Sequence, residues 1–194
     1  MIHALAKKAC KAFLNKPFMV DKRDREAVYT YALELLISHF CSFMTILLIA
    51  ALCHIIRPTF IFLLFYVPLR AKTGGYHASS YLLCYITTVI VYTAAILFLF
   101  YVLPLLSTAS NCLIFVLCAV YILYRAPIIN SHHPLSTQQI SNAKVAIKFL
   151  LVIDLIISLL CAMNGWSSFL SIITVSLLTD AVLMIISSRK EGLW

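Results

Sequence analysis

Long apolar runs separated by short polar segments make up most of the chain, and this pattern predicts membrane-spanning helices. A helix that crosses a hydrocarbon core of about 30 Å needs about twenty predominantly apolar residues. Six runs are candidates, at residues 29–53, 59–69, 81–102, 110–124, 145–162 and 169–187. The sequence therefore predicts an all-α polytopic membrane protein with six transmembrane segments.

The second run, residues 59–69, is shorter than the others. Its length of about eleven residues is too small for a straight crossing. Either its helix extends past Arg57 and Arg70, whose long side chains can reach the membrane surface, or the segment is tilted or re-entrant. The pattern leaves these alternatives open.

The N-terminal region differs from the rest of the chain. Residues 2–16 place apolar side chains on one stripe and lysines on other faces, which is typical of an amphipathic helix at a membrane surface, although a frayed solvated helix fits too. The first apolar run is too long for a signal-peptide core, and further spans follow it, so we expect no cleaved signal. We predict a basic cytoplasmic segment at 1–26, a transmembrane domain at 27–188 and a cytoplasmic tail at 189–194.

Composition and charge narrow the class of protein. Hydrophobic residues are 63% of the chain, charged residues 11%, and the mean hydropathy is +1.00, which excludes an ordinary soluble enzyme. The net charge is +8, but no basic patch is interleaved with aromatic residues, so we expect no nucleic-acid partner. Six crossings leave only Arg57 outside among the fifteen Lys and Arg residues. This asymmetry predicts six crossings with both termini cytoplasmic and the lipid bilayer as the surroundings of the chain.

The seven cysteines show no CxxC pair and are odd in number, so they indicate neither a disulfide framework nor a zinc site. His132 and His133 have no third ligand nearby in the sequence, and we expect no metal and no cofactor.

Residues 70–84 are the most promising site for chemistry, because they hold two of the four glycines. Gly74-Gly75 predicts a tight turn. Cys84 is predicted within the first turns of the next helix, whose positive end favours a thiolate. His77 would lie in the preceding loop and is the candidate base for a Cys–His nucleophile pair. A packed cysteine and an interfacial histidine are the structural alternative.

The spacing of seven residues decides how such a pair could form. On one continuous helix His77 and Cys84 would share a face but lie about 10 Å apart along the axis. Direct contact therefore requires the chain before Ser79 to fold back, or pairing between protomers. Ser79 or Ser80 is expected to cap the helix rather than to act in catalysis.

Three carboxylates fall within membrane runs, where an ionisable group suggests a functional site. Glu34 is expected at the depth of Cys84, where it could orient His77 as a third member, although a structural glutamate in the helix bundle is a strong rival. Asp154 and Asp180 could pair with Ser, Thr or Lys148 in the helix bundle.

The segment 70–84 resembles the signature loop of the accessory gene regulator B (AgrB) family, bacterial membrane endopeptidases that process the quorum-sensing propeptide AgrD. The shared residues are Arg70, Gly75, His77 with the following alanine, and Cys84. The length, the basic N-terminal segment and the six-segment hydropathy also agree. A second family-like stretch covers residues 124–127 and 134–135, but the usual lysines of that loop are missing from 128–133.

The resemblance implies a cysteine endopeptidase with Cys84 as nucleophile and His77 as base. The implied partner is an AgrD-like precursor peptide, cut before its acidic tail through an acyl-thioester on Cys84 and then cyclised to a thiolactone or lactone. Arg70 and Lys72 would bind the substrate's acidic tail, and Gly75 would shape the turn. The family also implies a homodimer.

Two other classes of protein compete with this interpretation. A small transporter would use Arg70, Glu34, Asp154 and Asp180 as an ion path, but the sequence shows no internal repeat that favours it. A non-catalytic peptide-binding scaffold would share the binding residues and differ only in the reactivity of Cys84.

Overall fold

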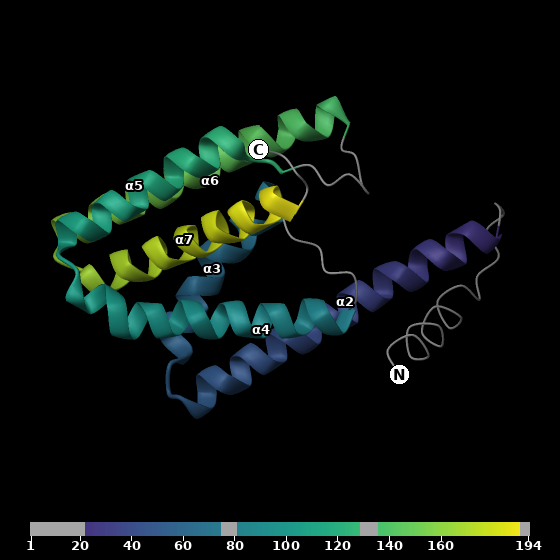
Figure 1. Ribbon diagram of the computed structural model, residues 1–194, viewed down its shortest axis with the longest axis horizontal. Helices are drawn as coiled ribbons and strands as arrows, with labels where there is room; N and C mark the ends of the chain where they lie inside the picture. Colours follow the sequence, from purple (N-terminus) through teal and green to yellow (C-terminus); the bar gives the residue numbers. More distant parts are fainter. Residues whose placement is uncertain (1–21, 75–80, 129–135, 191–194) are drawn as a thin grey trace. The chain divides into compact units, whose positions relative to one another are not determined.

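The computed structural model describes residues 22–74, 81–128 and 136–190 (Figure 1). Helices follow one another along the chain: α2 (Lys22–Leu52), α3 (Ile56–Thr73), α4 (Tyr81–Leu97), the π-helical turn η1 (Phe98–Val102), the 3-10 turn η2 (Leu103–Leu105), α5 (Thr108–Arg125), α6 (Thr137–Met163) and α7 (Ser167–Lys190). The all-α class predicted from the apolar runs is confirmed. The predicted amphipathic helix at residues 2–16 lies outside the described residues.

Each of the six apolar runs lies largely within one of these helices. Among the described residues, four segments are long and apolar enough to cross a membrane: Leu82–Leu105, Thr108–Arg125, Thr137–Met163 and Ser167–Arg189. The apolar part of α2, residues 36–52, is slightly shorter. The chain is therefore a multi-pass membrane protein.

Helix α3 shows that the short second run belongs to a longer helix. It starts before Arg57 and ends after Arg70, so the helix is longer than its apolar part. At 1.5 Å per residue its 18 residues extend for about 27 Å. The helix length thus approaches the thickness of the hydrocarbon core, and the charged side chains lie near its two ends.

Pro104 explains how the third predicted span ends. A proline ring clashes with the carbonyl four residues earlier, here that of Phe100, and has no N–H to donate. Helix α4 accordingly passes into the π-helical turn η1 and then into the short turn η2, which contains the proline. The chain then reaches Ser107, whose side chain accepts a hydrogen bond from the Ser110 amide and caps α5.

The chain forms two compact units. The first comprises residues 1–52 and 78–90, and so contains α2 and the first turns of α4. Within it, Thr45 Oγ1 lies 3.0 Å from the Tyr85 hydroxyl and links the two helices.

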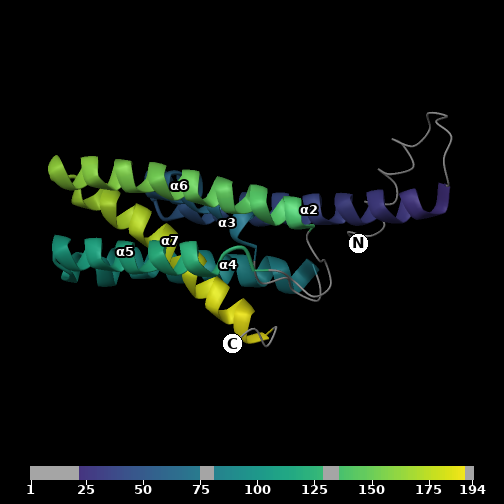
Figure 2. The same cartoon turned by 90° about the horizontal axis from the view of Figure 1, so that it is seen from above.

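The second unit comprises residues 53–77 and 91–194 and is built around α7. Helix α7 contacts α3, α5, α6 and η1. In its membrane-spanning window 61% of the residues are buried, against 22–28% for the other three spans. Figure 2 shows α7 running obliquely between α6 and α5. The last helix in the sequence is therefore the central helix of this unit.

Hydroxyl side chains on α7 are compatible with this buried position because backbone carbonyls satisfy them. Thr174 and Thr179 each donate to the carbonyl four residues earlier, at 2.9 and 2.7 Å. Ser176 donates to the Ile173 carbonyl at 2.7 Å. A polar group that is hydrogen-bonded internally costs little in an apolar environment.

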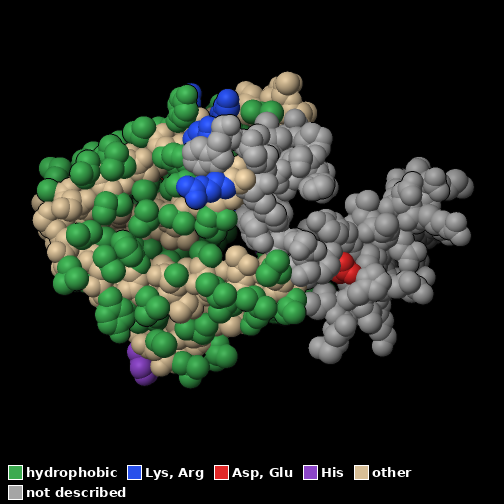
Figure 3. All heavy atoms as spheres, in the orientation of Figure 1, with side chains coloured by type: hydrophobic (Ala, Val, Ile, Leu, Met, Phe, Trp, Pro, Cys, Tyr) green, Lys and Arg blue, Asp and Glu red, His purple; other side chains and the backbone are tan. Residues whose placement is uncertain are grey.

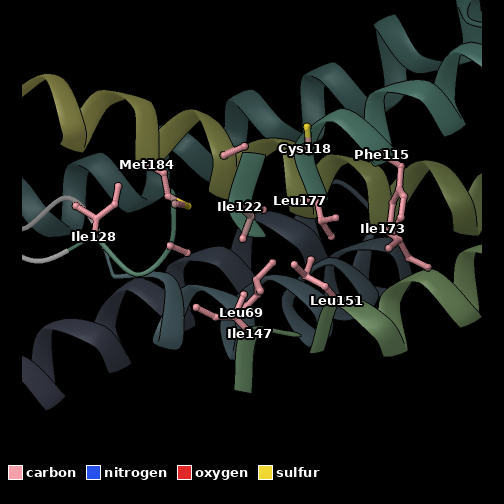
Figure 4. Packing of buried hydrophobic residues seen from close by; sticks show 12 residues of the cluster. Leu69, Phe115, Cys118, Ile122, Ile128, Ile147, Leu151, Ile173, Leu177 and Met184 are labelled. Atoms are coloured by element: carbon pink, nitrogen blue, oxygen red, sulfur yellow. The ribbon is translucent and has the colours of Figure 1, made fainter. Parts of the chain in front are cut away.

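A hydrophobic core joins α3, α5, α6 and α7 (Figure 4). Leu69, Ile122, Ile147, Leu177 and Met184 belong to it and are almost completely buried. The outward faces of the helices also carry large apolar side chains, and Figure 3 shows them over much of the described surface. Apolar residues both inside and outside are what a helix bundle in lipid requires.

Candidate functional site

Cys84 is the fourth residue of α4 and therefore lies in the first turn of the helix. Its side chain is half-buried, and its carbonyl accepts a hydrogen bond from Thr88 Oγ1 at 2.8 Å. Amide groups of a first helical turn point towards the N-terminus and make that end electropositive. Cys84 therefore lies at the electropositive end of α4.

The structure describes only some of the other residues predicted for the Cys–His site. His77, Gly75, Ser79 and Ser80 lie outside the described residues. Glu34 lies on α2, in the same compact unit as Cys84, and is buried.

Arg70 and Thr73, in the last turn of α3, both contact Asp180 of α7. An Arg70 guanidinium nitrogen lies 3.3 Å from Asp180 Oδ1, and Thr73 Oγ1 donates to the same oxygen at 3.1 Å. The Asp180 side chain is fully buried, whereas that of Arg70 is 20% exposed. The predicted threonine partner of Asp180 is confirmed, and the cation beside it is Arg70, whereas Lys148 is exposed.

Gly74 follows directly and has the backbone conformation predicted for a glycine turn. Its φ of 70° and ψ of −162° lie in a region that is essentially restricted to glycine. The Ile128 amide donates to the Thr73 carbonyl at 2.9 Å, and Gly74 and Ile128 form an isolated parallel bridge. A Cβ on Gly74 would come within 2.6 Å of the Ile128 carbonyl oxygen. The segment after α5 therefore packs directly on the chain that leaves α3.

Sequence reasoning predicted neither the ion pair between Arg70 and Asp180 nor the contact between Gly74 and Ile128. Arg70 and Asp180 are 110 residues apart in the sequence, and an arginine near a membrane boundary is ordinarily assigned to the membrane surface. A buried carboxylate in an apolar run does signal that a cation is nearby, but not which one.

Lys72 remains exposed on the last turn of α3. The bridge between Gly74 and Ile128 brings this end of α3 close to the end of α5, whose last residue is Arg125. Figure 3 shows Lys and Arg side chains gathered at neighbouring places on the surface. This end of the second unit is thus a basic surface able to attract anionic groups.

Asp154 of α6 is a second buried carboxylate. Its Oδ2 and the Ser158 hydroxyl, one helical turn further on, have no hydrogen-bond partner within the described ranges. In those ranges no three His, Cys, Asp or Glu side chains are grouped as a metal site would require.

These features define a polytopic α-helical membrane protein with a cysteine at the start of α4. Earlier in the sequence, the end of α3 is basic and contacts Asp180 through Arg70 and Thr73. The family model for accessory gene regulator B matches residues 6–187, and the chain belongs to this family. The protein accordingly takes part in processing the peptide signal of agr quorum sensing. Comparisons with curated proteins and with solved structures gave no match.

Proposed function

We propose that the protein is a membrane-embedded cysteine endopeptidase that removes the C-terminal tail of an AgrD-like propeptide. The proposal rests chiefly on Cys84, which is half-buried in the first turn of α4. His77 precedes it by seven residues, and the whole segment lies inside the matched family region.

The reaction begins when His77 removes the proton from the Cys84 thiol. The thiolate attacks the peptide carbonyl before the tail, the C–N bond breaks, and the tail leaves as an amine that takes the proton from His77. The signal peptide remains as an acyl-thioester on Sγ. A thiol or hydroxyl of the substrate then attacks this thioester, the ring closes as a thiolactone or lactone, and the Cys84 thiol is restored.

Cyclisation requires that water does not intercept the thioester. Exchange of one thioester for another changes the free energy little, whereas hydrolysis is irreversible. Excluding water from the reacting centre prevents this side reaction. A half-buried cysteine at the start of an apolar helix suits this requirement better than an exposed one.

The remaining residues have supporting roles in this proposal. Glu34 orients His77, and Gly74 and Gly75 shape the turn before it. Lys72, which is exposed, attracts the acidic tail of the substrate. The enzyme acts as a homodimer in the bacterial plasma membrane, with both termini cytoplasmic.

Intact-mass analysis of the protein in nanodiscs, incubated with its short precursor peptide, tests the proposal. We expect an adduct whose mass equals the precursor without its tail, present in wild type and absent from Cys84→Ala. Cys112→Ala is the matched control, because Cys112 is also half-buried near the start of a membrane helix, α5. The control should form the adduct as wild type does.

The same experiment separates the competing functions. Binding of the precursor without cleavage, in wild type and variants alike, would refute the peptidase and support a scaffold. A transporter would show neither an adduct nor any dependence on Cys84.

A further inference from the structure

The reaction above makes no use of Asp180, although this carboxylate is fully buried within the membrane run of α7. We propose that Asp180 is a positioning residue that fixes the end of α3, and thereby the start of the chain segment that carries His77. This inference rests on the proposed function.

The contacts of Asp180 converge on one turn of α3. Its Oδ1 accepts from Arg70 at 3.3 Å and from Thr73 at 3.1 Å. Its Oδ2 has no hydrogen-bond partner within residues 22–74, 81–128 and 136–190. A buried carboxylate is tolerated only when a cation and hydrogen-bond donors compensate its charge. Moving Arg70 or Thr73 away would leave the buried Asp180 carboxylate less well compensated, and this free-energy cost holds both residues at Asp180.

Thr73 links the contact with Asp180 to the position of the main chain. Its side chain is fully buried against Asp180, and its carbonyl accepts the Ile128 amide at 2.9 Å. The next residue, Gly74, is pressed against the Ile128 carbonyl and turns the chain through a conformation that only glycine adopts readily. Contacts from α7 and from the segment after α5 thus fix the point where the chain leaves α3.

His77 follows Gly74 by three residues. A shift of Thr73 and Gly74 would move the origin of the segment that leads to the base. A misplacement of about 1 Å in a catalytic group is enough to lower the rate by about 100-fold. Asp180 touches neither substrate nor reacting atoms in this account and acts only through α3.

Asp180→Asn is the direct test, because it keeps the size of the side chain and removes its charge. Asp154→Asn is the matched control, because Asp154 is also buried on a membrane helix. Within the described part of the chain, Asp154 forms no hydrogen bond or ion pair with α3. Tail cleavage of the precursor gives kcat and KM separately. We expect kcat of Asp180→Asn to fall by about 100-fold with KM little changed, and Asp154→Asn to behave as wild type.

Limited trypsin digestion supplies a readout that does not depend on catalysis. The Lys72–Thr73 bond lies in the last turn of α3, where the contact with Asp180 holds it. In Asp180→Asn the hydrogen bonds from Arg70 and Thr73 go to a neutral oxygen instead of a charged one and are weaker by about 1–1.5 kcal/mol, so cleavage that follows the population of the opened turn should be about 10-fold faster. Cleavage after Arg70, in the same turn, should rise as well, whereas cleavage outside this turn should not change, which distinguishes opening of the turn from general unfolding.

The double variant Arg70→Met/Asp180→Met tests whether the two residues act as a unit. Removing both charges leaves no uncompensated ion, so the double variant should cleave precursor faster than Arg70→Met alone. Equal rates would overturn the proposal, as would a normal kcat in Asp180→Asn or trypsin resistance unchanged at Lys72. If wild type itself fails to cleave, the peptidase is refuted and the positioning role with it. Normal cleavage by wild type and by Asp180→Asn together would refute the positioning role alone.

Discussion

Replacing Gly74 with alanine would place a Cβ 2.6 Å from the Ile128 carbonyl oxygen. Main-chain atoms cannot rotate away as the end of a flexible side chain can, so the two segments must separate. Separation stretches the hydrogen bond from the Ile128 amide to the Thr73 carbonyl, now 2.9 Å long. The variant therefore loses a contact and also holds alanine at a φ of 70° and a ψ of −162°.

The size of the effect follows from these two terms. A non-glycine residue in such a backbone region costs about 1–3 kcal/mol. The net loss of one hydrogen bond adds about 0.5–1.5 kcal/mol. We expect Gly74→Ala to lower the free energy of unfolding by about 2–4 kcal/mol.

Gly165 provides the matched control. It also has a positive φ, 72°, but nothing lies within 4 Å of the position its Cβ would take. Gly165→Ala should therefore cost only the backbone strain, about 1–2 kcal/mol. The larger loss in Gly74→Ala contains the contact with Ile128, together with the difference in backbone strain between the two positions.

Unfolding by SDS in mixed micelles, followed by far-ultraviolet circular dichroism, gives both free energies. Gly74→Ala should unfold at lower SDS than Gly165→Ala and should be cut faster by trypsin after Lys72. Equal destabilisation of the two variants would refute the close approach of Gly74 to Ile128.

Three further predictions concern the helix bundle. Thr59 Oγ1 and the Tyr92 hydroxyl are buried and 2.6 Å apart, so Thr59→Val should lower the free energy of unfolding by about 1–3 kcal/mol. Adding Tyr92→Phe should recover part of this loss in a double-mutant cycle measured by SDS unfolding, and additive losses would contradict the pairing. Ser136 caps α6 in a capping box with Gln139, and Ser136→Ala should lower stability by about 1 kcal/mol in the same assay. With both termini cytoplasmic, a membrane-impermeant maleimide should label exposed Cys53 in intact cells, and labelling only after lysis would contradict that topology.

The helices could be predicted from the sequence because the signal for each is local. A run of about twenty apolar residues has to satisfy its backbone internally when it enters lipid, and a helix does so within the segment. Pro104 likewise ends the third run through its own ring and missing amide. The ends of α3 were harder, because Arg57 and Arg70 interrupt the apolar pattern without interrupting the helix.

Some features of the candidate site were also predictable from local sequence, and others were not. Cys84 could be placed at a helix start because the glycines, serines and apolar run around it are adjacent in sequence. The roles of Cys84 and His77 came from the family resemblance and stay a prediction that the cleavage assay tests. The cation that compensates Asp180 could not be predicted, since Arg70, Lys72 and Lys148 are equally good cations until the helices are packed.

The sequence by itself determined the class of membrane protein, the approximate positions of six helices and the candidate nucleophile, because apolar periodicity and glycine turns act over a few residues. The tertiary structure decided that α7 is the central helix of its unit, that Arg70 compensates Asp180, and that Gly74 packs on Ile128. These contacts join residues from separate helices, and their energies depend on distance and burial in the packed bundle, which no local pattern records.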